Sequence, residues 1–105
     1  MGYARLDLLY VVSKLSEAAI RKATGLNYGL SDVPRSLRDA GEEIVERVAS
    51  QLVVDDEDTL RCKICGRGPF TRKGLYLHIR RVHLDIVYDI VRSELETYLW
   101  RLKNT

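Results

Sequence analysis

The stretch that decides the fold begins at Cys62-Lys63-Ile64-Cys65 and ends at His78-Ile79-Arg80-Arg81-Val82-His83. Two residues separate the cysteines, four separate the histidines, and twelve lie between the two pairs. All the cysteines and histidines of the 105-residue chain fall within this pattern. Thiolate sulfur and imidazole nitrogen form a ligand set that a tetrahedral zinc ion prefers. The sequence therefore predicts one zinc ion held by Cys62, Cys65, His78 and His83.

The pattern resembles that of the two-cysteine, two-histidine (C2H2) zinc finger family, over about residues 60–83. The resemblance implies a ββα unit in which a hairpin carries the cysteines and a helix carries the histidines. Leu75 stands three residues before His78, as the family expects. Phe70 comes one residue later than usual, and Pro69 takes the expected place. We therefore expect a remodelled knuckle between Cys65 and Phe70.

A weaker likeness joins the chain to small single-finger proteins of thermophilic archaea and their viruses. It rests on the finger, the size and the composition. Asparagine and glutamine are scarce while charge is abundant, a bias that hyperthermophile proteins often show. Many of those small proteins are presumed transcriptional regulators, so the likeness favours DNA over RNA as a partner.

The predicted zinc site is structural, because four protein ligands leave no coordination position for water or substrate. The chain has no HExxH motif, phosphate loop, nucleotide fingerprint or nucleophile elbow. We therefore expect a protein that is not an enzyme. No run approaches the roughly 18 apolar residues that cross a membrane, and closely spaced thiols suit a reducing compartment. These features predict a cytoplasmic protein without a membrane partner.

Apolar residues at helical spacing predict three helices around the metal-binding pattern. The first runs from Tyr3 to Thr24, with Gly25 as its stop. The second takes Asp32 as its N-cap and holds Pro34 in its first turn, where the missing amide costs nothing. The third follows the finger.

The second helix should end before the acidic run Asp55-Asp56-Glu57-Asp58, because acids oppose the dipole at a helix C-terminus. We interpret this run as a solvated linker. Beyond His83, apolar residues recur at helical spacing from Leu84 to Leu102. This stripe is too wide to stay in water. It must pack on the N-terminal helices, on a second copy of the chain, or on both.

The expected fold is mostly α: a three-helix domain with an embedded ββα C2H2 zinc finger. Its parts are an N-terminal helical pair (1–55), the finger (59–83) and a C-terminal helix (84–105). The hairpin strands are predicted at Thr59-Leu60-Arg61 and Pro69-Phe70. Residues five apart on an α-helix point ~140° apart, so His78 and His83 reach one ion only if the helix is irregular between residues 80 and 84.

The charge is unevenly distributed along the chain. The formal net charge is only +2, yet residues 61–83 carry seven bases and no acid. The remainder carries 10 bases and 15 acids. Such an asymmetry indicates an anionic partner for the basic segment, although the same charges could simply keep a small module in solution.

Sequence-selective reading of DNA is not expected from this finger. The family's base-reading positions correspond to Thr71, Gly74 and Leu77. None of these side chains can form the bidentate hydrogen bonds that arginine makes to guanine or asparagine to adenine. Phosphate contacts with double-stranded DNA, weakly selective and salt-dependent, are favoured instead. The candidate nucleic-acid-binding residues are Arg61, Lys63, Arg67, Thr71, Arg72, Lys73, Arg80 and Arg81.

The alternative function is a protein–protein interaction adaptor that uses the apolar helical faces. Its candidate surface is the stripe from Leu84 to Leu102, with Tyr98 and Trp100 near the end. The same residues could form the intramolecular core or a homodimer interface, and the core is the favoured interpretation.

Overall fold

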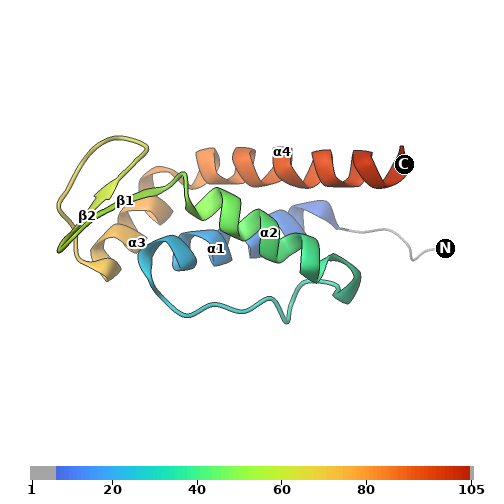
Figure 1. Ribbon diagram of the computed structural model, residues 1–105, viewed down its shortest axis with the longest axis horizontal. Coiled ribbons are helices and arrows are strands. Elements are labelled where there is room, and N and C mark those ends of the chain that lie inside the picture. The colour runs from blue at the N-terminus through green and yellow to red at the C-terminus, as the bar shows by residue number, and fades with distance from the viewer. Residues whose placement is uncertain (1–6, 105) are drawn as a thin grey trace.

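The computed structural model describes residues 7–104. Along the chain lie α1 (Leu8–Thr24), the short 3-10 helix η1 (Arg35–Leu37), α2 (Arg38–Ala49), β1 (Val53–Asp56), β2 (Thr59–Cys62), α3 (Arg72–Val82) and α4 (Leu84–Lys103) (Figure 1). Helices α1, α2 and α4 form the helical part, and β1, β2 and α3 form the ββα unit. The predicted mostly α fold with an embedded ββα unit is confirmed.

Local sequence signals define both ends of α1. The Asp7 side chain accepts a hydrogen bond from the Tyr10 N–H (3.2 Å) and caps the helix. Gly25 ends it with φ of 80°, a conformation that costs glycine little. The predicted stop is therefore confirmed. The start predicted at Tyr3 lies outside the described residues, and the described helix begins at Leu8.

The second helix begins later than predicted. The Val33 N–H donates to the Leu30 carbonyl (3.0 Å), so Asp32 lies inside a turn. The Asp32 carboxylate pairs with Lys14 of α1 (3.5 Å), and α2 begins only at Arg38. The prediction that Asp32 caps this helix was therefore wrong, as was the place of Pro34, which precedes η1. Burial of Val33 favours the turn, because it brings this side chain into the core.

Helices α1 and α2 run in the same direction, and α4 runs opposite to both (Figure 1). The segment between α1 and α2 therefore returns along their length before α2 begins.

The ion pairs Lys22–Glu46 (3.3 Å) and Arg47–Glu94 (3.1 Å) join neighbouring helices. Gly41 permits close packing of α2, because a β-carbon there would lie 3.0 Å from the Leu15 side chain.

One apolar core joins the four α-helices. Its members at 2% exposure or less include Val12 and Leu15 of α1, Ile44 and Val48 of α2, Leu75 and Ile79 of α3, and Val87, Val91 and Leu95 of α4. The stripe that follows His83 thus packs against the other helices within the chain. The ββα unit shares this core, because Leu75 and Ile79 belong to it.

The hairpin differs from the predicted one. Strand β2 pairs in an antiparallel manner with β1, from Val53↔Cys62 to Asp56↔Thr59. The predicted partner, Pro69-Phe70, contributes a single bridge, in which the Phe70 N–H donates to the Leu60 carbonyl (2.8 Å). Proline has no amide to donate, so a longer ladder cannot form there.

The acidic run is part of the hairpin and not a linker, contrary to our interpretation. Asp55 and Asp56 lie in β1, and Glu57-Asp58 form the turn between the strands. Glu57 has φ of 58°, which a two-residue hairpin turn requires. The β-branched pair Val53-Val54 favours the strand over a solvated segment.

We expect Leu15→Ala to lower the free energy of unfolding by about 2–5 kcal/mol, because Leu15 is fully buried where α1 meets α2. Leu9→Ala is the matched control on the same helix, since the Leu9 side chain is 69% exposed; its effect should stay within about 0.5 kcal/mol. Urea unfolding followed by circular dichroism measures both. Equal losses in the two variants would contradict the described core.

Candidate metal centre

The four predicted ligands come together at one end of the molecule. Cys62 ends β2, Cys65 follows in the knuckle, His78 lies on α3, and His83 stands between α3 and α4. Their ligand atoms all lie within 4.8 Å of one another, and Cys65 Sγ lies 3.3 Å from His78 Nε2. The edges of a zinc tetrahedron with two thiolates and two imidazoles measure about 3.3–3.8 Å. The group could therefore hold a metal ion after a slight contraction.

The knuckle between the cysteines and α3 is built by backbone hydrogen bonds and two glycines. The Gly66 N–H donates to the Cys62 carbonyl (2.8 Å), and the Cys62 N–H donates to the Arg67 carbonyl (2.9 Å). Gly66 has φ of 80° and Gly68 has φ of 152°. A β-carbon at Gly68 would lie 3.0 Å from the Leu60 carbonyl oxygen. Both positions therefore favour glycine.

Phe70 supports His78 despite its shifted place in the sequence. The two rings stack with centroids 4.8 Å apart and planes 26° apart. This contact orients the imidazole toward Cys65 Sγ. The knuckle thus accommodates one additional residue between Cys65 and Phe70, and the Phe70 ring still packs on His78.

The helix breaks at His83, as the spacing of the histidines predicts. Helix α3 ends at Val82, and His83 has φ of −121° and ψ of 16°, outside the α-helical region. Its N–H still donates to the Ile79 carbonyl (2.9 Å), and its carbonyl accepts from the Val87 N–H (3.0 Å). The His78 and His83 rings lie 5.0 Å apart and nearly perpendicular, at 80°. The break therefore turns His83 toward the cysteines.

Burial makes this cluster costly without an ion. Cys62 is fully buried and His83 is 7% exposed. His83 Nε2 is buried and has no hydrogen-bond partner among residues 7–104, a condition that costs about 1–3 kcal/mol. A cation coordinated by this nitrogen would remove the penalty. The residues present therefore fit a metal ion.

The electrostatics of the cluster agree with this fit. Burial raises the pKa of the Cys62 thiol above its ordinary value, partly opposed by backbone hydrogen bonds from Cys65 and Ile64. Burial, followed by repulsion from His83 and Arg67, lowers the pKa of His78. The neutral imidazole that ligates metals is thus favoured, whereas the Cys62 thiolate needs a nearby cation.

The predicted nucleic-acid-binding residues do not form one uniform set. All of them are exposed: Arg61, Lys63, Arg67, Thr71, Arg72, Lys73, Arg80 and Arg81. They differ in the contacts that they make within the chain. The Thr71 hydroxyl caps α3 by accepting from the Gly74 N–H (3.0 Å). The Arg72 guanidinium lies against Gly25 at the end of α1, so close that a β-carbon on residue 25 would collide with it. The Lys63 ammonium donates to the Ser50 carbonyl (3.3 Å).

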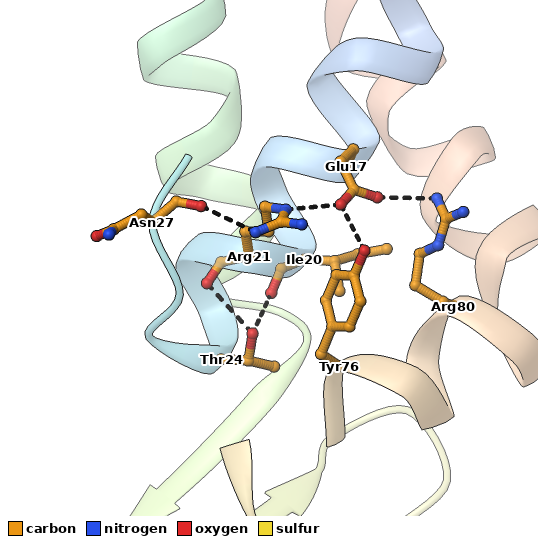
Figure 2. A network of polar contacts seen from close by, with 7 residues as sticks. All are labelled: Glu17, Ile20, Arg21, Thr24, Asn27, Tyr76 and Arg80. Carbon is orange, nitrogen blue, oxygen red and sulfur yellow. Dashed lines mark hydrogen bonds and ion pairs between the residues drawn. The ribbon is translucent and has the colours of Figure 1, made fainter. Parts of the chain in front are cut away.

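Arg80 belongs to a polar network that the sequence analysis missed (Figure 2). The Glu17 carboxylate accepts hydrogen bonds from the Tyr76 hydroxyl (2.6 Å), Arg21 Nε (2.7 Å) and Arg80 Nη1 (2.8 Å). The Glu17–Arg21 pair, four residues apart, is visible in the sequence. Its link to Tyr76 and Arg80 is not, because it depends on how α3 packs on α1. The network thus attaches the histidine-bearing helix to α1.

The network changes the acidity of Glu17. Burial alone would raise the pKa of this carboxyl, but hydrogen bonds from Tyr76 and Arg21 and the charge of Arg80 outweigh it and lower the pKa. A lowered folded-state pKa contributes stability above the unfolded-state value and loses it as the pH falls through the folded-state value. Glu17 therefore stabilises the fold at neutral pH.

We expect Glu17→Gln to lower the free energy of unfolding at pH 7 by about 1.5–3 kcal/mol, the range for hydrogen bonds to charged groups. The difference from the unsubstituted chain should stay constant between about pH 7 and pH 6 and shrink below about pH 4, as both states become protonated. Glu43→Gln removes an exposed acid on α2 and is the control. Denaturant unfolding across this pH range measures both, and a difference independent of pH would contradict the role of Glu17.

No helix among residues 7–104 is long and apolar enough to span a membrane. Comparisons with protein-family models, with curated proteins and with solved structures gave no match. The candidate functional site is a Cys2His2 cluster that follows a β-hairpin, lies partly on a helix and is consistent with a C2H2-like zinc site.

Proposed function

We propose that the chain binds one structural zinc ion through Cys62, Cys65, His78 and His83. We also propose that the ββα unit binds double-stranded DNA through phosphate contacts with weak sequence selectivity. The observation that carries the proposal is the convergence of four donors around a buried, partnerless His83 Nε2. A role in transcription regulation is the corresponding biological proposal.

The donor set favours zinc over other divalent ions. Two thiolates and two imidazoles at tetrahedral spacing suit zinc, whereas magnesium and calcium prefer oxygen ligands. The set is complete with four protein donors, so the ion would hold the fold together and leave no position for a substrate. Cys62 and His83 are buried beside the common core, which connects the ion to the rest of the domain.

One face of α3 remains for a partner. Tyr76 and Arg80 face α1, and Leu75 and Ile79 enter the core. The face left over carries Lys73, Leu77 and Arg81 on successive turns, with Gly74 next to Lys73. Both cations on it are exposed and form no ion pair with residues 7–104.

The dimensions of this face suit duplex DNA. Lys73 and Arg81 lie eight residues apart, or about 12 Å along the helix axis. The major groove of B-form DNA is also about 12 Å wide, so the two cations could reach phosphates on both sides. The deep, narrow major groove of duplex RNA does not admit a helix. This geometry supports DNA over RNA.

The same face supports weak selectivity. Gly74 and Leu77 lie between the two cations and offer no hydrogen-bonding group to a base edge. The Thr71 hydroxyl is already engaged in the helix cap. Arg67, close enough to His78 to affect its pKa, adds a third exposed cation beside the metal centre. Affinity would therefore come from phosphates, with sequence contributing little.

The adaptor alternative loses most of its candidate surface. Val87, Val91 and Leu95 of the apolar stripe are buried within the chain. Ile86, Trp100 and Leu102 stay exposed on α4, at 41%, 64% and 57%, but nearly four helical turns separate Ile86 from the other two. No observation favours this function over DNA binding.

We expect elemental analysis of the purified protein to find close to one zinc per chain, and Cys62→Ser to abolish stoichiometric binding. A strong chelator should cause one cooperative loss of helical circular dichroism from the whole chain, because the metal centre adjoins the core that all the helices share. Cobalt substitution should give the absorption of a tetrahedral thiolate site. Folded protein with almost no metal would refute the zinc proposal.

We expect the double substitution Lys73→Glu and Arg81→Glu to weaken binding to duplex DNA of unrelated sequences alike and to flatten its salt dependence. Each lost phosphate contact removes about 0.9 from the slope of log K against log salt. Arg35→Glu combined with Arg101→Glu, at exposed sites on η1 and α4, reverses the same number of charges away from this face and is the control. Fluorescence anisotropy at two salt concentrations provides the measurement. Unchanged DNA binding in the double variant would contradict the proposed face.

A further inference from the structure

Along the outer edge of the hairpin, some backbone groups of β1 point away from β2. In an antiparallel ladder, hydrogen-bonded residue pairs alternate with pairs that are not bonded to each other. The Lys63 N–H donates to the Leu52 carbonyl (2.9 Å), next to the pair Val53↔Cys62. The alternation then makes Val53 and Asp55 the β1 residues whose N–H and C=O groups point away from β2.

The opposite edge of the hairpin confirms this alternation. The Leu60 carbonyl accepts from Phe70, and the Cys62 N–H donates to Arg67. Leu60 and Cys62 are the register partners of Asp55 and Val53, so their backbone groups also point out of the two-stranded ladder. The knuckle therefore covers the β2 edge, whereas no segment within residues 7–104 covers the β1 edge in this way.

The β1 edge is accessible. No hydrogen bond from elsewhere in residues 7–104 reaches the backbone of Val53 or Asp55, and β2 is the element that lies most extensively against β1. Asp55 and its neighbours Val54 and Asp56 are exposed, and Val53 is half-buried. An accessible strand edge is a template for another extended chain.

The charges along this edge select among possible occupants. Asp55, Asp56, Glu57 and Asp58 follow one another at the edge and in the turn. Pairing β1 with β1 of a second copy would place acids beside acids, which is unfavourable across strands. A nucleic acid would be repelled as well. An extended chain with lysine or arginine side chains has the complementary charge.

We propose that β1 is a docking strand that binds a basic, extended segment of a partner protein by adding a third strand to the hairpin. The outward N–H and C=O groups of Val53 and Asp55 pair with the partner's backbone. The acids select its charge. Asp55 and Asp56 point to opposite faces of the sheet, so the segment carries basic residues at neighbouring positions. The proposal does not depend on the DNA contact proposed for α3.

The test uses the zinc-loaded full chain and a fluorescein-labelled, eight-residue peptide in which pairs of lysines alternate with pairs of valines, so that both faces of the added strand carry basic residues. Anisotropy titrations compare this peptide with one in which glutamate replaces lysine, and with a lysine peptide N-methylated at alternate residues. Asp55→Pro removes an outward N–H without breaking the β1–β2 ladder, because that amide is not bonded to β2. Asp55→Asn removes the charge and keeps the amide.

We expect salt-sensitive binding of the lysine peptide and no binding of the glutamate peptide. Asp55→Asn should weaken binding by up to about fivefold. Asp55→Pro and peptide N-methylation should each weaken it by about tenfold or more. The methylated peptide keeps the test decisive if Asp55→Pro does not fold.

Three results would overturn the proposal. They are no binding of the lysine peptide to the unsubstituted chain, equal binding of the methylated and unmethylated peptides, or reversible dimerisation of the chain that Asp55→Pro abolishes. Equal binding would mean that charge alone attracts the peptide. Dimerisation through this edge would mean that a second copy covers β1. None of these three results depends on whether the α3 variants lose DNA binding, so the two proposals can fail separately.

Discussion

The convergence of two cysteines and two histidines is the constraint on which the rest of the structure depends. Their ligand atoms lie within 4.8 Å of one another although up to 20 residues separate them in the chain. To reach this point, the helix must break at His83 and the knuckle must turn tightly through Gly66 and Gly68. The break divides α3 from α4 and thereby allows α4 to lie along α1 and α2.

The ββα unit is integrated into the helical domain. Leu75 and Ile79 enter the core that α1, α2 and α4 also build, and Glu17 ties α1 to α3 through Tyr76 and Arg80 (Figure 2). Since all four α-helices share this core, an ion bound at one end would add its binding free energy to the stability of the whole domain. The same packing covers two faces of α3 and leaves one for a partner.

The two signs of charge occupy different parts of the ββα unit. Acids line β1 and the hairpin turn, whereas exposed cations lie on the knuckle and the outer face of α3. The proposed DNA contact and the proposed strand docking therefore use separate surfaces. One chain of 105 residues could thus hold a basic protein segment beside a DNA duplex.

The sequence by itself determined the Cys2His2 cluster, the mostly α class, the helix stop at Gly25 and the break at His83, because each follows from local spacing or backbone stereochemistry. Only the tertiary structure decided that β1 pairs with β2, that Asp32 lies in a turn, and that Arg80 binds Glu17. These features depend on which surfaces meet. The acidic segment of β1 forms a strand because β2 lies beside it. Arg80 becomes a structural partner of Glu17 because α3 packs on α1.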